Sequence, residues 1–401
     1  MFGKYIQSSN DNSNRINWGI IFSILMLAII GMVAIFVAVS HDSTATSITH
    51  ALLPQFLWYI IGGIAMVIIM QFDSEQLWKL TPYAYGFGIF LLTAVLIFYS
   101  RSYAVQTGAK NWFQIGPLTF QPSEVMKPAY ILMLAKVSVE HNNKCPRHTV
   151  KTDWLLIGKL FLWVLPITIL LKLQNDFGTI LVFYAILAGV IVVSGVTWKI
   201  IIPTFAAVAA LGGTALALVA TTFGKEILGH LGFQAYQFAR VNTWLNPSQN
   251  TSNQGYQLWQ SIKAVGSGGI TGTGFNVSHV YVPVRESDMI FSVIGENFGF
   301  IGGCILILLY FLLIYQMVKV TFQTRNVFYA YISTGVIMMI LFHVFENIGM
   351  SIGLLPLTGI PLPFVSQGGS ALIGNMMGIG LIMSMQYHNT DYLFSNDRKF
   401  S

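Results

Sequence analysis

Residues 289–318 read MIFSVIGENFGFIGGCILILLYFLLIYQMV, an apolar run longer than the roughly 20 residues that a helix needs to cross a bilayer. Asp288 stands directly before this run, at the end of a polar, glycine-rich stretch over 223–288. A carboxylate at the mouth of a membrane helix is costly to desolvate, so it is kept there mainly when it has a function. The alternative is a helix N-cap, in which Ser287 or Asp288 satisfies free backbone amides.

The composition excludes a water-soluble globular protein. Of the 401 residues, 54% are hydrophobic and 9% are charged, whereas soluble domains carry about 25% charged residues. Apolar stretches of membrane length recur along the whole chain. They cover 16–39, 51–71, 82–99, 123–139, 154–171, 177–196, 200–222, 289–318, 328–350 and 369–386. The sequence therefore predicts an all-α polytopic membrane protein: one integral membrane domain over 1–401, with about ten transmembrane helices and a long extracellular loop (223–288) between helices seven and eight.

The distribution of cations in the short loops predicts the orientation. If the N-terminus is inside, the inner loops receive most of the lysines and arginines, and the short outer loops hold only Arg101, Lys110 and Lys172. Residues 1–15 and 387–401 are then cytoplasmic, and the protein is expected to be a multi-pass protein of the cytoplasmic (plasma) membrane. The net charge of +6 is a topology signal and an attraction to anionic lipid, and it does not indicate a nucleic-acid partner.

Polar residues collect on the predicted outer side. Residues 108–127 read GAKNWFQIGPLTFQPSEVMK, in which Ser123 is a candidate N-cap that places Glu124 in a first helical turn. Glu124 and Lys127 are three residues apart, hence on one helix face, where they can neutralise each other. The pair is either a structural ion pair or part of a site. Asp176, in the segment QNDFGT over 174–179, is interpreted first as a helix cap.

The later segments add further candidates. In 255–274, Gln257 and Ser261 share a helical face, and the glycines that follow can expose amides to an anionic or carbohydrate ligand. In 289–318, Glu296 is a second acid, on a stripe of small residues that admits a neighbouring helix. His343 and Glu346 of the ninth helix are expected to hydrogen-bond across helices. The segment 355–370 has three prolines and the run Gly368-Gly369-Ser370, and it is predicted to be re-entrant or tightly packed at membrane depth.

Acid and cations beside a lipid-facing groove suit a lipid-linked substrate that carries a pyrophosphate. Asp288, half-desolvated, is the candidate general base, with a raised pKa. The cations expected near a leaving pyrophosphate are Arg101, Lys110 and Lys127, or a bound divalent cation, magnesium or manganese. If the reaction is a glycosyl transfer, one well-placed carboxylate in place of a pair predicts direct displacement with inversion. Alternatives are a transporter that flips the lipid, which fits less well because the polar groups do not line a path, and a non-enzymatic scaffold, which would not need Asp288.

In the segments 108–127, 174–179, 255–274, 288–299 and 347–370 the chain resembles the SEDS family of cell-wall polymerases, the RodA/FtsW/SpoVE group. Residues 280–288, VYVPVRESD, resemble the elongation branch of the family more than the division branch. Departures from the family pattern are Asn175, where proline is usual, Asn297, where a second glutamate is usual, and Gln367, where tyrosine is usual.

The resemblance implies a peptidoglycan glycosyltransferase that polymerises lipid II for cell elongation and shape, with Asp288 as its catalytic residue. It also implies a single-span class B penicillin-binding protein as partner, alongside other elongation-complex proteins. We expect the partner's helix to dock on helices eight and nine, at the small residues Ser292, Gly295, Gly299, Gly349 and Ser351. The predicted substrate-binding residues are Trp112, Lys110, Glu124, Lys127, Arg101, Gln257, Ser261, Lys263, Arg285, Ser366, Gly368 and Gly369, and Asp176 and Glu296 are predicted to support them.

Overall fold

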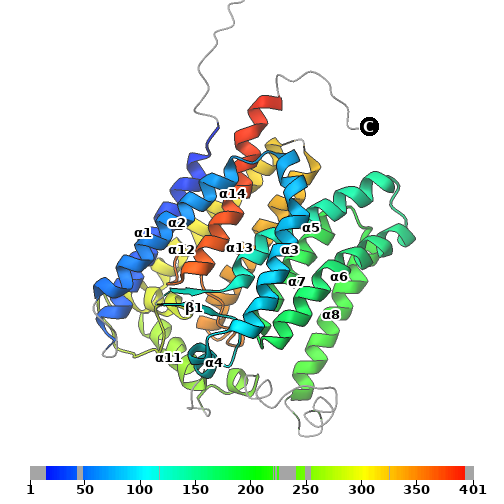
Figure 1. The fold of residues 1–401 in the computed structure, drawn as a ribbon. Coiled ribbons are helices and arrows are strands. Elements are labelled where there is room, and N and C mark those ends of the chain that lie inside the picture. The colour runs from blue at the N-terminus through cyan, green and yellow to red at the C-terminus, as the bar shows by residue number, and fades with distance from the viewer. Residues whose placement is uncertain are drawn as a thin grey trace, which may run out of the picture.

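The structure is a computed structural model that describes residues 15–42, 48–116, 118–219, 221, 224, 241–248, 254–324 and 326–392. Long helices pack side by side into a bundle, and the shorter elements gather at one end of it (Figure 1). The elements are α1 (Trp18–Ser40), α2 (Ile48–Met70), α3 (Ser74–Phe98), α4 (Arg101–Thr107), β1 (Phe113–Ile115), β2 (Leu118–Phe120), α5 (Pro122–Lys144), α6 (Val150–Leu173), α7 (Phe177–Val193), α8 (Trp198–Val219), α11 (Gln254–Ser267), α12 (Ile290–Gln323), α13 (Val327–Ser351) and α14 (Gly369–Tyr392).

The predicted membrane fold is confirmed. Within the described residues, seven helices are long and apolar enough to cross a membrane, namely α1, α2, α3, α6, α8, α12 and α13, and α7 is a shorter apolar helix. Two of the predicted spans, α5 and α14, are long but less apolar. Both are largely buried by the helices packed around them: α5 contacts α3, α13 and α14, and α14 also contacts α2. A helix enclosed by protein does not need an apolar surface, because lipid does not reach it.

The ends of the bundle differ in content. The start of α1 and the end of α14 lie at one end, whereas α4, β1 and α11 lie at the other (Figure 1). Within the described residues, the first long helix, α1, therefore begins on the side of the bundle where the last one, α14, ends. The terminal segments themselves, 1–14 and 393–401, lie outside the described residues, as do Arg240 and much of the predicted loop over 223–288.

A short hairpin departs from the all-α prediction. Strands β1 and β2 pair antiparallel, with Phe113 opposite Phe120 and Ile115 opposite Leu118. Gly116 follows β1 with a φ of 62°, a left-handed conformation that glycine adopts without steric cost. Strands of three residues are too short to leave a pattern among segments of membrane length. The hairpin leads directly into α5, whose N-cap is Gln121 and not the predicted Ser123.

The glycines over 268–274 pack against a kink in α12. Gly299 has a non-helical φ of 63°, and the amides of Phe300 and Ile301 donate instead to the carbonyls of Gly269 and Ile270, over 2.9 and 3.1 Å. In return, the amide of Thr273 donates to the carbonyl of Glu296 over 2.9 Å. These glycine-segment groups replace the helical bonds lost at the kink, so the expectation that they bind a ligand is not supported by their contacts.

The same contacts occupy the small-residue stripe of α12. A methyl group added at Gly268 would come within 1.9 Å of the carbonyl oxygen of Gly295. One added at Gly299 would come within 2.4 Å of the amide nitrogen of Gly272. Leu355 similarly covers Gly349, and Ser351 bonds to the carbonyl of Asn347. The prediction that a partner helix docks on these small residues must therefore be corrected, because segments of the chain itself already cover them.

Candidate active site

Asp288 lies two residues before the start of α12 and does not cap it. The N-cap of α12 is Met289, which makes no side-chain capping bond. The alternative interpretation of Asp288 as a helix cap is therefore wrong. The residue is partly buried, and its carboxylate faces the backbone of Gly359, where an added methyl group would come within 3.3 Å of Oδ2. Gly359 has a φ of 77°, so both its conformation and its missing side chain allow the chain to pass close to Asp288.

Burial makes the Asp288 carboxyl a weaker acid than an exposed aspartate. Desolvation, with a smaller contribution from the negative charge of Glu286, raises the pKa of Asp288 from 3.8 to about 7, against a hydrogen bond from Ser287 that lowers it. Burial also raises the pKa of Glu286 above its usual value. A carboxyl with a pKa near the working pH is present in both protonation states, which is the property that a general base or acid requires.

The backbone that leads to Asp288 is fixed by the segment 352–368 and by α13. The hydroxyl of Ser366 donates to the carbonyl of Ser287 over 2.6 Å, and the amide of Gln367 donates to the carbonyl of Glu286 over 2.9 Å. The side-chain amide of Asn347, on α13, donates to the carbonyl of Asp288 over 2.8 Å. Three consecutive carbonyls are thus held by separate donors, which fixes the direction of the Asp288 side chain before any substrate binds.

Arg285 and Glu296 hold the same loop from the other side. The Arg285 guanidinium is buried and donates to the hydroxyl of Ser278 over 2.8 Å and to the carbonyl of Ala38 in α1 over 3.2 Å. Glu296 accepts from the amides of His279 and Val280, over 2.7 and 3.0 Å, and lies 3.8 Å from Arg285. Arg285, predicted to bind substrate, is therefore turned into the protein, and Glu296 holds the loop through the amides of His279 and Val280.

Glu124 and Lys127 form the expected ion pair. The Lys127 ammonium donates to both carboxylate oxygens of Glu124, over 2.7 and 2.8 Å, and lies 3.1 Å from Nε2 of His343 on α13. All three side chains are buried. His343 and Asn347 are four residues apart and share one face of α13. The ion pair and the backbone of Asp288 are therefore bound to adjacent turns of the same helix, about 6 Å apart along its axis.

Asp176 caps α7, as the sequence predicted, and also holds the hairpin. Its carboxylate accepts from the amide of Thr179 over 3.2 Å, from the side chain of Asn111 over 2.7 Å and from that of Gln121 over 3.0 Å. Asn175 beside it has a φ of 60°, which proline cannot adopt. The departure from the family pattern at Asn175 therefore matches a left-handed backbone.

The hairpin end of the molecule carries two of the predicted cations in exposed positions. Arg101 opens α4, and Lys110 precedes β1 with its ammonium 5.3 Å from the ring centre of Tyr99. Both side chains are exposed, and Arg101 and Lys110 are therefore free to meet an anionic ligand in a way that Arg285 is not. Trp112 is half-buried, with its ring 6.1 Å from that of Tyr103.

The predicted residues of α11 mainly brace the loop. Gln257 donates to the carbonyl of Pro283 over 3.1 Å, and buried Ser261 donates to the carbonyl of Ser351 over 2.8 Å. Lys263 is exposed, with its ammonium 6.0 Å from the ring of Trp259. Of these three, only Lys263 offers a charge to the outside.

The run 366–370 joins the Asp288 loop to the start of α5. Ser366 binds Ser287 as described, and the hydroxyl of Ser370 accepts from the amide of Gln121 over 3.0 Å. A methyl group added at Gly368 would meet no atom within 4 Å, whereas one at Gly369 would clash with the ring of Trp58. Gly368, next to the residue that holds Glu286, therefore borders open space.

Residues of α2 in this region were missed from the sequence. Gln55 accepts from the amide of Gly368 over 3.1 Å, and Tyr59 donates to the carbonyl of Phe364 over 2.7 Å. Gln55 is buried within an apolar segment. The sequence signal for Gln55, which the prediction did not use, is a lone amide side chain within a membrane span.

Residues 18–391 match the model of the FtsW/RodA/SpoVE family, described as cell cycle proteins. The chain is 34% identical over 332 residues to the peptidoglycan glycosyltransferase MrdB of Escherichia coli, covering 82% of this chain and 83% of that protein. Among solved structures it matches a chain from "Structural coordination of polymerization and crosslinking by a peptidoglycan synthase complex", with a TM-score of 0.74, 26% identity, and coverage of 95% and 99%. It also matches the rod shape determining protein RodA of Thermus thermophilus, with a TM-score of 0.65, 25% identity, and coverage of 93% and 97%.

Proposed function

We propose that this chain, which belongs to the FtsW/RodA/SpoVE family and is a peptidoglycan glycosyltransferase, polymerises lipid II with Asp288 as its general base. The observation that carries the proposal is the partly buried carboxyl whose pKa is raised to about 7 on a backbone fixed by three donors. The elongation branch is favoured by the segment 280–288, and the side of the membrane is the outer one predicted from the loop cations.

The reaction joins the 4-hydroxyl of the acceptor sugar to the anomeric carbon of the lipid-linked donor. As the new carbon–oxygen bond forms, Asp288 takes the hydroxyl proton, and the bond to the pyrophosphate breaks with its electron pair leaving on the phosphate. General-base assistance of this kind contributes about 10²–10⁴-fold to the rate. Displacement from the opposite face inverts the anomeric centre, because no second carboxylate is assigned the role of a nucleophile.

The negative charge that develops on the leaving pyrophosphate needs cations. Arg101 and Lys110 are exposed at the end of the molecule that holds the hairpin, and Lys263 adds a third free charge on α11. The Lys127 ammonium is already bonded to Glu124, so its contribution is to position α5 against α13. Trp112 and the open edge at Gly368 are proposed to contact the sugars.

A divalent cation remains part of the proposal. Within the described residues no group of three histidine, cysteine, aspartate or glutamate side chains is placed to hold a metal. Glu286 lies near enough to Asp288 to influence its carboxyl electrostatically and offers the hard oxygen ligands that magnesium and manganese prefer. Glu286 would hold such an ion jointly with the substrate phosphates, which leaves Asp288 free to accept the proton, and the ion would neutralise charge on the pyrophosphate.

The partner is proposed to be a class B penicillin-binding protein with one transmembrane helix. Since the small residues of α12 are covered, we assign the contact to the outward face of α12, where Ile301, Ile305, Leu308, Leu312 and Tyr315 are all at least 37% exposed. Their spacing of four and three residues is the spacing at which one helix packs along another. Other elongation-complex proteins would then reach the enzyme through this partner.

The decisive experiment uses the purified chain with fluorescent lipid II, with and without the transpeptidase partner. The wild-type protein should produce glycan strands, and Asp288→Asn should reduce synthesis at least a hundredfold, the lower bound for loss of a general base. Arg285→Lys keeps the Asp288 carboxyl but weakens the bonds that hold the loop, so its activity shows how much loss a disturbed loop alone causes. An Asn variant that retains substantial polymerisation would falsify the assignment of Asp288.

A further inference from the structure

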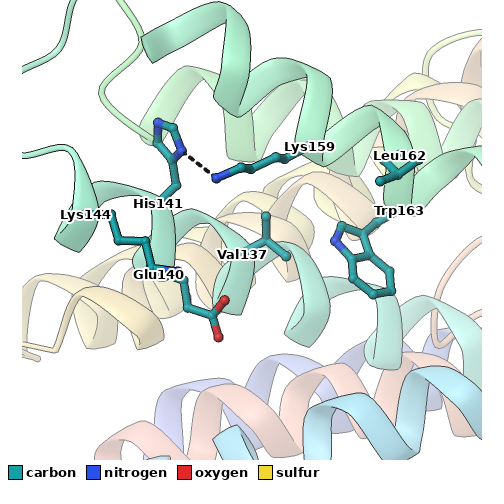
Figure 2. Close-up of a pocket in the computed structure, with 7 residues that line it drawn as sticks. All are labelled: Val137, Glu140, His141, Lys144, Lys159, Leu162 and Trp163. Atoms are coloured by element: carbon teal, nitrogen blue, oxygen red, sulfur yellow. Dashed lines mark hydrogen bonds between the residues drawn. The ribbon is translucent and has the colours of Figure 1, made fainter.

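A pocket of ≈ 170 Å³ lies between the last turns of α5 and the middle of α6 (Figure 2). His141 lies about 25 Å further along α5 than Glu124, at 1.5 Å per residue, so the pocket is at the opposite end of the bundle from Asp288. The proposed polymerase site does not use it. By the distribution of loop cations, this end faces the cytoplasm.

The cations of the pocket are not neutralised. The Lys159 ammonium lies 3.3 Å from Nδ1 of His141. An ammonium group can only donate, so Nδ1 is the acceptor and the imidazole is neutral. Within the described part of the chain no carboxylate lies within ion-pair distance of Lys159. Lys144 adds a second charge at the mouth, whereas the carboxylate of Glu140 points away from Lys159 (Figure 2). A half-buried ammonium without an acid favours an anionic occupant.

The remaining walls are apolar and rigid. Trp163 is held by Tyr85 of α3, whose ring stands edge-on to it at 5.1 Å and whose hydroxyl donates to the Trp163 carbonyl over 2.6 Å. Val137 is buried on the α5 side, while Leu162 is 65% exposed. Leu165 on the same outward face of α6 is 51% exposed. The pocket therefore opens from a surface that faces lipid, beside a tryptophan of the kind that is enriched at membrane interfaces.

We propose that this pocket binds an anionic phospholipid of the adjacent leaflet. Lys159 and Lys144 contact the headgroup phosphate, and Val137, Leu162 and Trp163 contact the glycerol and the first acyl carbons. Basic pockets between transmembrane helices on the cytoplasmic side are suited to anionic headgroups. The lipid would be a structural ligand of α5, the helix that carries Glu124 and Lys127 at its other end.

The test measures lipid binding and does not depend on polymerase activity. Delipidated full-length protein is titrated with phosphatidylglycerol, phosphatidylethanolamine or phosphatidylcholine, and bound lipid is counted by native mass spectrometry. We expect preferential retention of phosphatidylglycerol, and a loss of affinity of about fivefold in Lys159→Gln, the factor for one lysine near an anionic surface. Lys172→Gln, an exposed lysine at the other end of α6, is the matched control and should bind as the wild type does.

Three further arms decide the chemistry. If Lys159→Gln does not fold, Lys144→Gln takes its place, because Lys144 is at an exposed position. Lys144→Gln should also weaken binding. Glu140→Gln removes a negative charge that repels an anionic headgroup, so it should tighten binding. Weaker binding of this variant, together with a preference for phosphatidylethanolamine, would show that the pocket binds a zwitterionic headgroup and would overturn the proposal. Glycerol phosphate, which lacks acyl chains, should not compete at equal concentration. Equal competition, or an equal loss in Lys172→Gln, would overturn the lipid site in favour of a soluble anion or of non-specific adhesion.

Discussion

The side-chain amide of Asn347 donates a hydrogen bond to the backbone carbonyl of Asp288 over 2.8 Å. The same amide group donates to the carbonyl of Ile360 over 2.8 Å. Asn347 therefore joins Asp288 to the segment that passes in front of the Asp288 carboxylate at Gly359. A buried amide with two carbonyl partners is costly to remove, because each carbonyl is then left unsatisfied at about 1–3 kcal/mol.

Asn347→Leu should therefore misplace Asp288 without removing its chemistry. We expect the turnover number to fall at least tenfold with a smaller change in KM, since the reacting group and not the substrate contacts is displaced. Asn326→Ala removes the N-cap at the far end of α13 and should cost about 1 kcal/mol of stability with little loss of turnover. Equal losses of activity in the two variants would mean that general destabilisation of α13 explains the effect.

The pH dependence of polymerisation should report the Asp288 carboxyl. Its pKa is raised to about 7, and only the ionised form accepts a proton, so kcat/KM should fall tenfold per pH unit below about 7. Glu286→Gln removes a neighbouring negative charge that raises this pKa. The acid limb of the profile should then move to lower pH, and a limb that stays in place would show that another group controls the rate.

The same shift predicts how stability depends on pH. The folded-state pKa of Asp288 lies above its unfolded value of 3.8, so its contribution is fully present below pH 4 and is lost as the pH rises through about 7. Asp288→Asn cannot ionise and escapes that loss. Its Tm should exceed that of the wild type at pH 8, and the difference should shrink at pH 5. A Tm difference that does not change between these pH values would contradict the raised pKa.

The sequence predicted the helices well and the inner contacts of the site poorly, for a physical reason. Membrane spans are marked by the apolar surface they show to lipid, which is why α12 is evident from its composition, whereas the enclosed α5 is less apolar. Asp288 and the Glu124–Lys127 pair were marked by the cost of charge in a membrane. The direction of Arg285, in contrast, depends on the carbonyl of Ala38, which lies far away in the chain and leaves no local pattern.

The Glu124–Lys127 pair can be tested by exchange of its charges. Lys127→Met leaves a buried carboxylate without a partner, which should cost about 3–5 kcal/mol. Glu124→Lys combined with Lys127→Glu restores a pair on the same helix face and should recover much of the Tm. It also places a carboxylate beside His343 in place of the ammonium, so we expect the exchanged protein to fold but to remain inactive. Recovery of turnover together with Tm would assign the pair a purely structural role.

The proposed partner contact is tested on the outward face of α12. Gly299→Leu is unsuitable, because Gly299 has a φ of 63° and lies against the amide of Gly272, so the variant would disturb the enzyme itself. Ile305→Ala with Leu308→Ala trims side chains that are 51% and 54% exposed and leaves the kink intact. A partner helix that packs on them would lose van der Waals contacts, which are the main attraction between helices in lipid.

For this double variant we expect weaker co-purification of the partner and a loss of the activity that the partner stimulates, with basal polymerisation unchanged. A coupling of about 1–3 kcal/mol between partner binding and the active state corresponds to a 5–150-fold stimulation, so partial loss is measurable. Val208→Ala with Leu211→Ala on α8 is the matched control, since these side chains are 64% and 70% exposed and are also three residues apart. Normal binding and stimulation of the α12 variant, or an equal defect in the α8 variant, would rule out this face because lipid contact alone would then account for both.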